Sequence, residues 1–241
     1  MAVLAIETST RQLGVTALDG TRVLSSYEIL GDYPHAVELP GAVTRVLKEA
    51  KLELAGLDAL IVDIGPGSFT GLRIGLAFVK AIVFAQRLPV VGVASLDVLA
   101  ASVNFAPHPI YAVMDARQGN VYLARYRCDA QTQQLIKDSD YLLGPVAQVL
   151  ASWTQPAIFV GDGCLVHGEA IRQHVPQALM VPSEFWLPNA ATLARLGLAR
   201  WQRGEQDDPG QLVPLYLYPM DCSVRSADRT TSVIPKPVAA V

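Results

Sequence analysis

The chain has 241 residues, of which 51% are hydrophobic and 17% are charged, and its formal net charge is −3. This balance is typical of a compact globular protein, excludes a disordered chain and provides no overall basic field to attract nucleic acid. Three scattered cysteines, Cys128, Cys164 and Cys222, form no CxxC pair, which favours reduced thiols over a disulfide framework or a zinc site.

Hydrophobic periodicity and turn signals predict alternating strands and helices in the first half of the chain. The expected elements are, in order, strands at 3–7, 13–18 and 22–29, a helix at 35–51, a strand at 59–64, a helix at 70–86, a strand at 89–93 and a short helix from Ser95. The amino terminus lacks the basic start of a signal peptide, and the apolar segment 74–86 is too short for a bilayer and contains Lys80. We therefore expect a soluble, cytoplasmic protein.

The same order of elements starts again near residue 110. The expected elements are strands at 110–115, 121–127 and 134–142, a helix at 145–153, a strand at 157–160, a helix after Gly163 and an amphipathic helix at 188–203. The motif AIET at 5–8 corresponds to VMDA at 113–116, and IVDIGPG at 61–67 corresponds to AIFVGDG at 157–163. A repeat of about one hundred residues indicates two related domains and not a solenoid.

This repeated layout, with an acid closing each first strand, resembles the actin/Hsp70/sugar-kinase (ASKHA) superfamily. The resemblance implies an α/β fold of two tandem domains from an internal duplication, facing a cleft that usually holds ATP. We expect a first domain at 1–107 and a second at 108–218, whose last helix packs back on the first. Residues 219–241 lack periodicity and are expected to form a loosely ordered tail.

The segment DIGPGSFTGLRIG, residues 63–75, lies between a predicted strand and a predicted helix, where many proteins bind phosphate. A P-loop would need lysine and serine or threonine where this chain has LR, and a Rossmann loop would need glycine at Thr70. The helix start still offers free amides to an anion. Alternatively, Gly65 and Gly67 only shape the turn and Ser68 or Thr70 only caps the helix, and the chemistry favours this second interpretation.

The helix predicted at 70–86 is apolar on more than one side. Gly71 and Gly75 lie one turn apart on it. A second stripe of small residues consists of Ala77, Ala81 and Ala85. A surface helix normally has a single apolar stripe and a polar opposite face. The helix is therefore either fully buried in the core or covered by a partner protein through close backbone approach.

Five strings, in order along most of the chain, resemble the bacterial TsaB (YeaZ) family: LAIETS, GPGSFTGLRIGLAFVKA, PVVGVASLDVLA, MDARQGNVYLARY and VPLYL. The resemblance implies a non-catalytic paralogue of TsaD, the metal-dependent enzyme that transfers a threonylcarbamoyl group to N6 of adenosine 37 in tRNAs reading ANN codons. It implies a scaffold or activator of TsaD in this t6A modification, with the ATPase TsaE as a further partner. No cofactor is implied, and tRNA is expected only within the complex.

The resemblance also implies where partners bind, because the family's dimer surface is built on its first two helices. The residues expected to bind TsaD are Leu39, Val43, Leu47, Gly71, Leu72, Gly75, Phe78, Val79 and Ile82. For the isolated chain we expect a homodimer, since an apolar face without its partner often pairs with itself.

Two departures bear on chemistry. Where TsaD carries a metal-binding string with two histidines, this chain has Ser95 and Leu99, a pair that cannot hold a metal, and no HxxxH pair occurs elsewhere. Where the TsaB family usually has an arginine after PLYL, this chain has Tyr218. We therefore expect a non-catalytic protein without a metal.

A vestigial nucleotide site would consist of Glu7, Thr8, Ser9, Gly65, Gly67, Ser68, Asp115, Gly161 and Gly163. In its second half Arg117 crowds a turn where an actin-like ATPase needs small glycines. Glu7 and Asp115 either hold a hydrated Mg²⁺ or accept amide hydrogen bonds at their strand ends, and we favour the second role.

Two other functions are compatible with the sequence. An active ATPase or small-molecule kinase of the same superfamily would use Asp115 as a base, with Gly161 and Gly163 near the adenosine. A glycoprotease-like hydrolase is disfavoured, because the chain has neither the histidine pair nor a Cys/His or GxSxG arrangement.

Overall fold

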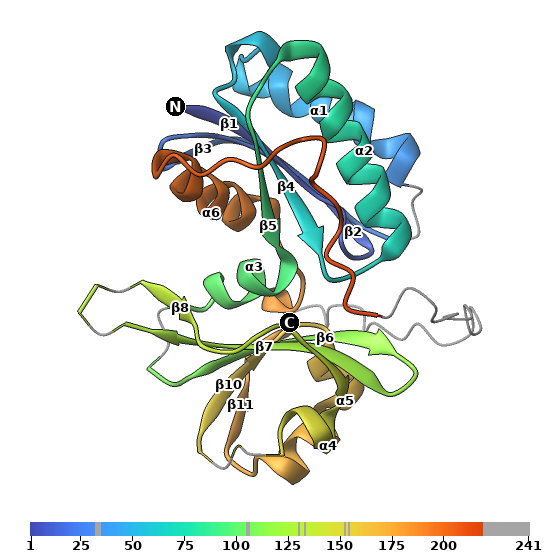
Figure 1. Ribbon diagram of the computed structural model, residues 1–241, viewed down its shortest axis with the longest axis vertical. Coiled ribbons are helices and arrows are strands. Elements are labelled where there is room, and N and C mark those ends of the chain that lie inside the picture. The colour runs from blue at the N-terminus through green and yellow to red at the C-terminus, as the bar shows by residue number, and fades with distance from the viewer. Residues whose placement is uncertain are drawn as a thin grey trace, which may run out of the picture.

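The computed structural model describes residues 1–31, 35–104, 107–129, 131–132, 134–151, 153 and 155–218. The tail expected at 219–241 lies outside the described residues. Two β-sheets make up the frame of the molecule, and helices cover their faces (Figure 1).

The first sheet has five strands in the order β3-β2-β1-β4-β5. Their bounds are β1 Ala2–Glu7, β2 Gln12–Asp19, β3 Arg22–Leu30, β4 Ala59–Gly65 and β5 Val90–Ala94. Strands β2 and β3 form an antiparallel hairpin beside β1, whereas β4 and β5 run parallel to β1. The central strand β1 is covered on both faces and is buried from Val3 to Glu7, which explains its nearly continuous apolar sequence.

Three helices cover this sheet (Figure 1). On one face lie α1 (His35–Ala50) and α2 (Phe69–Gln86), and on the other lies α6 (Ala190–Gln202). Two short 3₁₀ turns, Leu54–Gly56 and Ser183–Phe185, lie in the connections. Asn189 caps the start of α6, because its side chain accepts a hydrogen bond from the N–H of Thr192 at 2.8 Å. It lies close to the sheet at Gly197, where an added Cβ would be 2.2 Å from Cγ2 of Ile61.

The second sheet has the order β11-β10-β6-β7-β8, and β9 pairs with β7 beside β8. Its strands are β6 Ile110–Arg117, β7 Asn120–Cys128, β8 Leu135–Lys137, β9 Leu142–Pro145, β10 Ala157–Val160 and β11 Ala178–Met180. Helices α4 (Val146–Val149) and α5 (Gly163–His174) pack on one face, and α3 (Ser95–Ala101) packs on the other, between the two sheets (Figure 1).

The two sheets share one plan. In each, a first strand has an antiparallel neighbour on one side and two parallel strands on the other, the latter joined through helices. The α/β class predicted from the sequence is therefore confirmed, with two sheets. The internal duplication stays a prediction with which this shared plan is compatible.

The element boundaries differ from the sequence expectations at three places. The strand expected at 134–142 is two short strands, β8 and β9; the helix expected at 145–153 is the single turn α4; and β11 was not predicted. Helix α2 begins at Phe69, one residue before the predicted start at Thr70. Among the described residues α2 is the one helix that is long and apolar enough, by length and composition, to cross a membrane, and a single such helix is weak evidence for a membrane span.

Candidate functional site

The ends of β1 and β4 bring two fully buried carboxylates together, Glu7 and its neighbour Asp63. Glu7 Oε1 accepts hydrogen bonds from the N–H and the hydroxyl of Ser9, both at 2.6 Å. Asp63 Oδ1 accepts from the N–H of Gly65 and the hydroxyl of Ser95, both at 2.6 Å. Burial and the charge of Asp63 hold the pKa of Glu7 well above its usual value, and burial also raises the pKa of Asp63.

The glycine-rich loop packs directly on the connection that follows β1. A Cβ on Gly67 would lie 2.2 Å from the carbonyl oxygen of Ser9, and the N–H of Ser68 donates to that same oxygen at 2.6 Å. Gly65 has a φ of +100°, which favours glycine. The Ser68 hydroxyl accepts from the N–H of Gly71 at 3.2 Å and caps α2. These glycines provide a turn and room for the chain's own backbone.

The glycines after β10 have the same role in the second sheet. A Cβ on Gly161 would lie 2.1 Å from the carbonyl oxygen of Val113, and a Cβ on Gly163 would lie 2.6 Å from Cγ1 of Val113. Close packing of this connection on β6 therefore accounts for both residues without a ligand.

Asp115, near the end of β6, has partners from two elements. Its Oδ1 lies 3.1 Å from Nε2 of His167 on α5 and accepts from the N–H of Arg117 at 3.1 Å. Its own N–H donates to Oδ1 of Asp162 at 3.0 Å, and burial raises the pKa of Asp162 to about 6. Sequence reasoning missed His167, because nothing in its local sequence indicates an aspartate on another element.

Tyr218 covers the turn between β6 and β7. Its hydroxyl donates to the carbonyl oxygen of Ala116 at 2.8 Å and accepts from the side-chain amide of Asn120 at 3.3 Å. Its ring lies edge-on to that of Tyr122, with the centroids 6.0 Å apart. The residues expected to form a vestigial nucleotide site thus fall into two sets, one on each sheet, and each set makes contacts within the chain.

The residues expected to bind a partner divide into a buried and an accessible set. The buried set belongs to the inner sides of α1 and α2 and consists of Leu39, Val43, Leu47, Gly71, Leu72, Gly75 and Val79. Only Phe78 and Ile82 are partly exposed. The expected outward position of Gly71 and Gly75 is wrong, because an added Cβ would lie 2.1 Å from the Thr8 carbonyl oxygen at Gly71 and 2.2 Å from Thr8 Oγ1 at Gly75.

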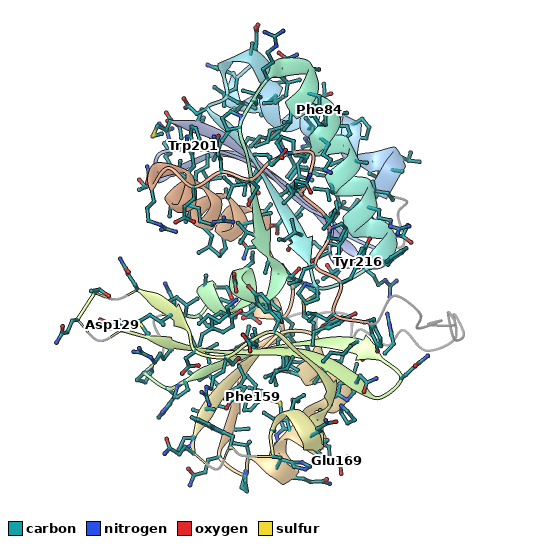
Figure 2. The ribbon with its side chains drawn as sticks, viewed as in Figure 1. Phe84, Asp129, Phe159, Glu169, Trp201 and Tyr216 are labelled. Atoms are coloured by element: carbon teal, nitrogen blue, oxygen red, sulfur yellow. The ribbon has the colours of Figure 1, made fainter. Side chains whose placement is uncertain are left out.

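A different set of side chains forms the surface of α2. We call this set the outer face of α2: the exposed Phe69, Ala77, Ala81, Phe84 and Ala85 with the partly exposed Phe78 and Ile82. Phe69 is 51% exposed and Phe84 is 65% exposed, which is unusual for large apolar side chains. Figure 2 shows Phe84 near one end of α2 and Tyr216 near the other.

Arg73 joins the start of this outer face to the segment that follows α6. Its guanidinium lies 3.7 Å from the ring centroid of Phe69, and its Nε donates to the hydroxyl of Tyr216 at 3.0 Å. The rings of Phe69 and Tyr216 are themselves 5.2 Å apart. Tyr216, which the sequence did not single out, therefore extends the apolar surface of α2.

Helix α3 carries the two positions where TsaD is expected to have histidines. The Ser95 hydroxyl is engaged by Asp63, and Leu99 is fully buried in the core between α3 and the second sheet. Between them, Asp97 accepts hydrogen bonds from the hydroxyls of Tyr126 at 2.6 Å and Tyr141 at 2.9 Å. In the described part of the chain, no three His, Cys, Asp or Glu side chains are grouped to hold a metal ion.

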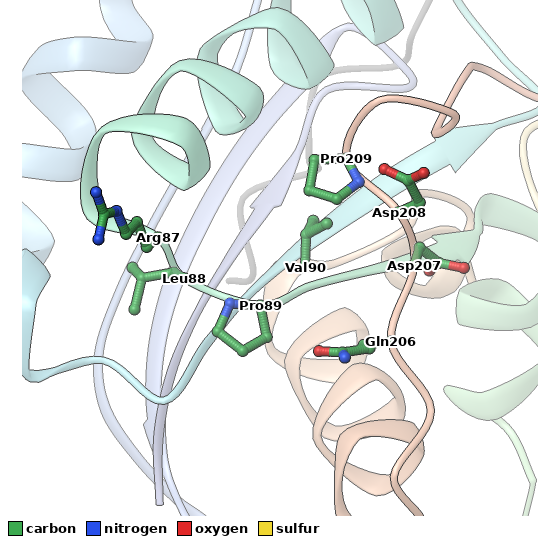
Figure 3. Close-up of a pocket in the computed structure, with 8 residues that line it drawn as sticks. All are labelled: Arg87, Leu88, Pro89, Val90, Gln206, Asp207, Asp208 and Pro209. Atoms are coloured by element: carbon green, nitrogen blue, oxygen red, sulfur yellow. The ribbon is translucent and has the colours of Figure 1, made fainter.

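A surface pocket of about 510 Å³ lies where the end of α2 meets the segment after α6 (Figure 3). Its lining residues are Arg87, Leu88, Pro89, Val90, Gln206, Asp207, Asp208 and Pro209. Asp207 is engaged by the N–H of Gly92 at 2.7 Å. None of the residues expected to bind a nucleotide or a partner lines this pocket.

The chain is similar to proteins of known family. A family model described as TsaD, tRNA N6-adenosine threonylcarbamoyltransferase, matches residues 32–219. The tRNA threonylcarbamoyladenosine biosynthesis protein TsaB of Bacillus subtilis is 29% identical over 219 residues, which cover 90% of this chain and 94% of that protein. The solved structure of YeaZ from Pseudomonas aeruginosa is 30% identical, covers 90% of this chain and 99% of that one, and superposes with a TM-score of 0.77.

A more distant solved structure is that of the ethanolamine utilization protein EutJ from Carboxydothermus hydrogenoformans, which is 13% identical and superposes with a TM-score of 0.50. The match covers 80% of this chain and 89% of that one, and at this identity it shows a similar fold only. The fold and the site thus define an α/β protein with two similarly built sheets and an apolar helix on its surface. The chain belongs to the TsaB/YeaZ family of tRNA threonylcarbamoyladenosine biosynthesis proteins.

Proposed function

We propose that this chain is a non-catalytic scaffold that binds and activates TsaD in the cytoplasmic complex forming t6A at position 37 of tRNAs reading ANN codons. TsaE is the further partner, and tRNA is contacted only within the complex. The observation that carries this proposal is the outer face of α2, where large apolar side chains are exposed to solvent on a long helix.

The shape of this face suits a helix from another protein. The small side chains Ala77, Ala81 and Ala85 follow each other at intervals of one turn, so a partner helix can approach closely along them. Large anchors, Phe69 and Phe84, stand near the two ends of the helix. Large, exposed aromatic side chains on one helix are a feature of surfaces that bind other proteins.

The positions at which a catalytic paralogue would bind metal support a role without chemistry. The Ser95 hydroxyl donates to Asp63, and Leu99 has no exposed surface, so both side chains serve the fold. A chain that assists TsaD would need its surface and not these positions.

The experiment is size-exclusion chromatography and titration of this chain with its cognate TsaD, with and without ATP and TsaE. Ala81→Glu places a charge in the middle of the outer face and should weaken TsaD binding at least tenfold, about 1.4 kcal/mol. Gln173→Glu adds the same charge on an exposed position of α5 and should bind normally. If wild-type chain binds TsaD under none of these conditions, the proposed function is wrong; normal binding by Ala81→Glu would refute the surface only.

The alternative, an active ATPase or small-molecule kinase, is separated by titrating the isolated chain with MgATP. We expect no binding, because the glycines of both loops make room for Ser9 and Val113 and not for phosphate. Micromolar binding that is lost in Asp115→Ala would favour the enzyme.

The same outer face is where a second copy would bind when TsaD is absent. We therefore expect Ala81→Glu to convert a homodimer of the isolated chain to a monomer, and Gln173→Glu to leave it unchanged.

A further inference from the structure

We propose that Glu7 and Asp63 share one proton, and that the resulting hydrogen bond stabilises the ends of β1 and β4 next to α3, the helix that lies between the two sheets.

The hydrogen bonds that surrounding residues donate to the pair leave one oxygen of each carboxyl group without a donor. Oε1 of Glu7 and Oδ1 of Asp63 each accept two hydrogen bonds from the surrounding chain. In the part of the chain that the structure describes, Glu7 Oε2 and Asp63 Oδ2 are buried without any other partner. Glu7 and Asp63 come directly after the paired residues Ile6 and Val62 of the adjacent parallel strands β1 and β4, so they are neighbours across the sheet.

Two negative charges in this position would be costly, since neither side chain has any exposed surface. A single proton removes one charge and turns the repulsion into a hydrogen bond from one carboxyl group to the other. The raised pKa of Glu7 has these same causes, burial first and then the neighbouring Asp63.

Ionisable groups on the elements around the pair have other partners. Asp97 of α3 accepts hydrogen bonds from Tyr126 and Tyr141, and Glu28 of β3 accepts one from the N–H of Ala190. Arg200 of α6 donates to the carbonyl oxygen of Gly92 and to Glu205. Among the described residues, no Lys, Arg or His forms an ion pair with Glu7 or Asp63. A shared proton would remove one of the two charges that no described side chain neutralises.

The pair is connected to the junction between the sheets. Asp63 accepts a hydrogen bond from the hydroxyl of Ser95 at the start of α3. Two residues later, Asp97 of the same helix accepts hydrogen bonds from Tyr126 of β7 and from Tyr141, between β8 and β9. Loss of the shared proton would place a second charge directly under the start of α3. The contacts of α3 at this junction should therefore be most stable while the pair holds its proton, and less stable once rising pH removes it.

The sign of the pH dependence follows from proton binding. The folded chain keeps a proton that the unfolded chain releases at ordinary carboxyl pKa values, so the folded state loses stability as pH rises above those values. The ratio of folded to unfolded chain should fall by up to about tenfold per pH unit until the folded pair also loses its proton.

Two variants test this assignment while keeping the shape of the site. Glu7→Gln and Asp63→Asn each replace the shared proton with an amide N–H that can donate to the remaining carboxylate. Each should flatten the pH dependence of unfolding by urea and increase the folded-to-unfolded ratio above neutral pH. Glu169→Gln, at an exposed position on α5, should leave the wild-type dependence unchanged.

Infrared spectroscopy in D₂O detects the proton directly in the wild-type chain and does not depend on whether a variant folds well. At neutral pD we expect the band of a protonated carboxyl group, present in the wild-type and Glu169→Gln proteins and lost in Glu7→Gln. Absence of this band from the wild-type protein would overturn the proposal. So would a destabilisation of both variants that is the same at every pH, because a merely structural role predicts that result.

Discussion

Gly75 of α2 and Thr8, the residue that follows β1, are in such close contact that no side chain fits between them. A Cβ on Gly75 would lie 2.2 Å from Oγ1 and 3.3 Å from Cβ of Thr8, which is itself fully buried. One turn earlier, Gly71 is as close to the Thr8 carbonyl oxygen. The two glycines therefore fix the distance between α2 and the end of β1.

Gly75→Ala should destabilise the fold by about 1–3 kcal/mol, the usual cost of overpacking a core, because a buried β-branched side chain cannot swing away. Gly71→Ala should cost more, since its obstacle is backbone. Urea unfolding of each variant measures both effects.

Gly41, in the middle of α1, is the matched control. Nothing lies within 4 Å of its added Cβ, and the position is exposed. Gly41→Ala should therefore stabilise the chain by about 0.5–1 kcal/mol, the ordinary helix preference for alanine. If Gly75→Ala behaves like Gly41→Ala, α2 does not pack on Thr8 as described.

The contrast between the glycines and the alanines of α2 marks a limit of sequence reasoning. The sequence displays both small-residue stripes, but it does not say which stripe faces the sheet. A glycine lets a backbone approach from the inside as readily as from the outside. Only the position of β1 decides that Gly71 and Gly75 face inward and Ala81 faces outward.

The strands show where sequence reasoning succeeds and where it fails. Strands β1 and β4 are central and covered on both faces, so their continuous apolar runs were sufficient to predict them. Strand β11 has three residues at the edge of its sheet, partly exposed, and left no such pattern. Asp63 could have been noticed as an acid within an apolar strand, but its pairing with Glu7 depends on the register between β1 and β4.

A second prediction concerns Asp97 and its two tyrosines. Burial, and then the charge of Asp97, raise the pKa of both Tyr126 and Tyr141, so both hydroxyls stay protonated and donate. Tyr126→Phe removes a hydrogen bond to a charged acceptor and should cost about 1.5–3 kcal/mol in the free energy of unfolding. Tyr141→Phe should cost less, because its ring is less buried.

The control for these variants is Tyr27→Phe on β3. The guanidinium of Arg45 lies over the ring of Tyr27, and a phenylalanine ring would keep this contact. Within the described residues the Tyr27 hydroxyl makes no hydrogen bond. Its removal should change the free energy of unfolding by less than about 0.5 kcal/mol. Equal effects at Tyr126 and Tyr27 would show that the Asp97 hydrogen bonds do not hold α3 to the second sheet.

The last prediction is a pH dependence from Asp162, whose pKa burial raises from 3.8 to about 6. A carboxyl group with a raised pKa in the folded state favours folding when protonated, so stability falls as pH rises from about 4 to about 6 and stays low above that. Asp162→Asn keeps an oxygen to accept from the N–H of Asp115 and removes the charge. It should stabilise the chain by about 1–3 kcal/mol at pH 7 and by almost nothing at pH 4.

Asp129→Asn should show the opposite sign, because hydrogen bonds from the N–H and hydroxyl of Thr132 lower the pKa of that exposed carboxyl group. Urea unfolding at pH 4 and pH 7 compares the two variants in one series. A loss of stability in Asp162→Asn at pH 7 would mean that the nearby cation Arg117 stabilises the carboxylate more than burial opposes it. In that case the end of β6 would be a charge-balanced cluster, and the raised pKa of Asp162 would be wrong.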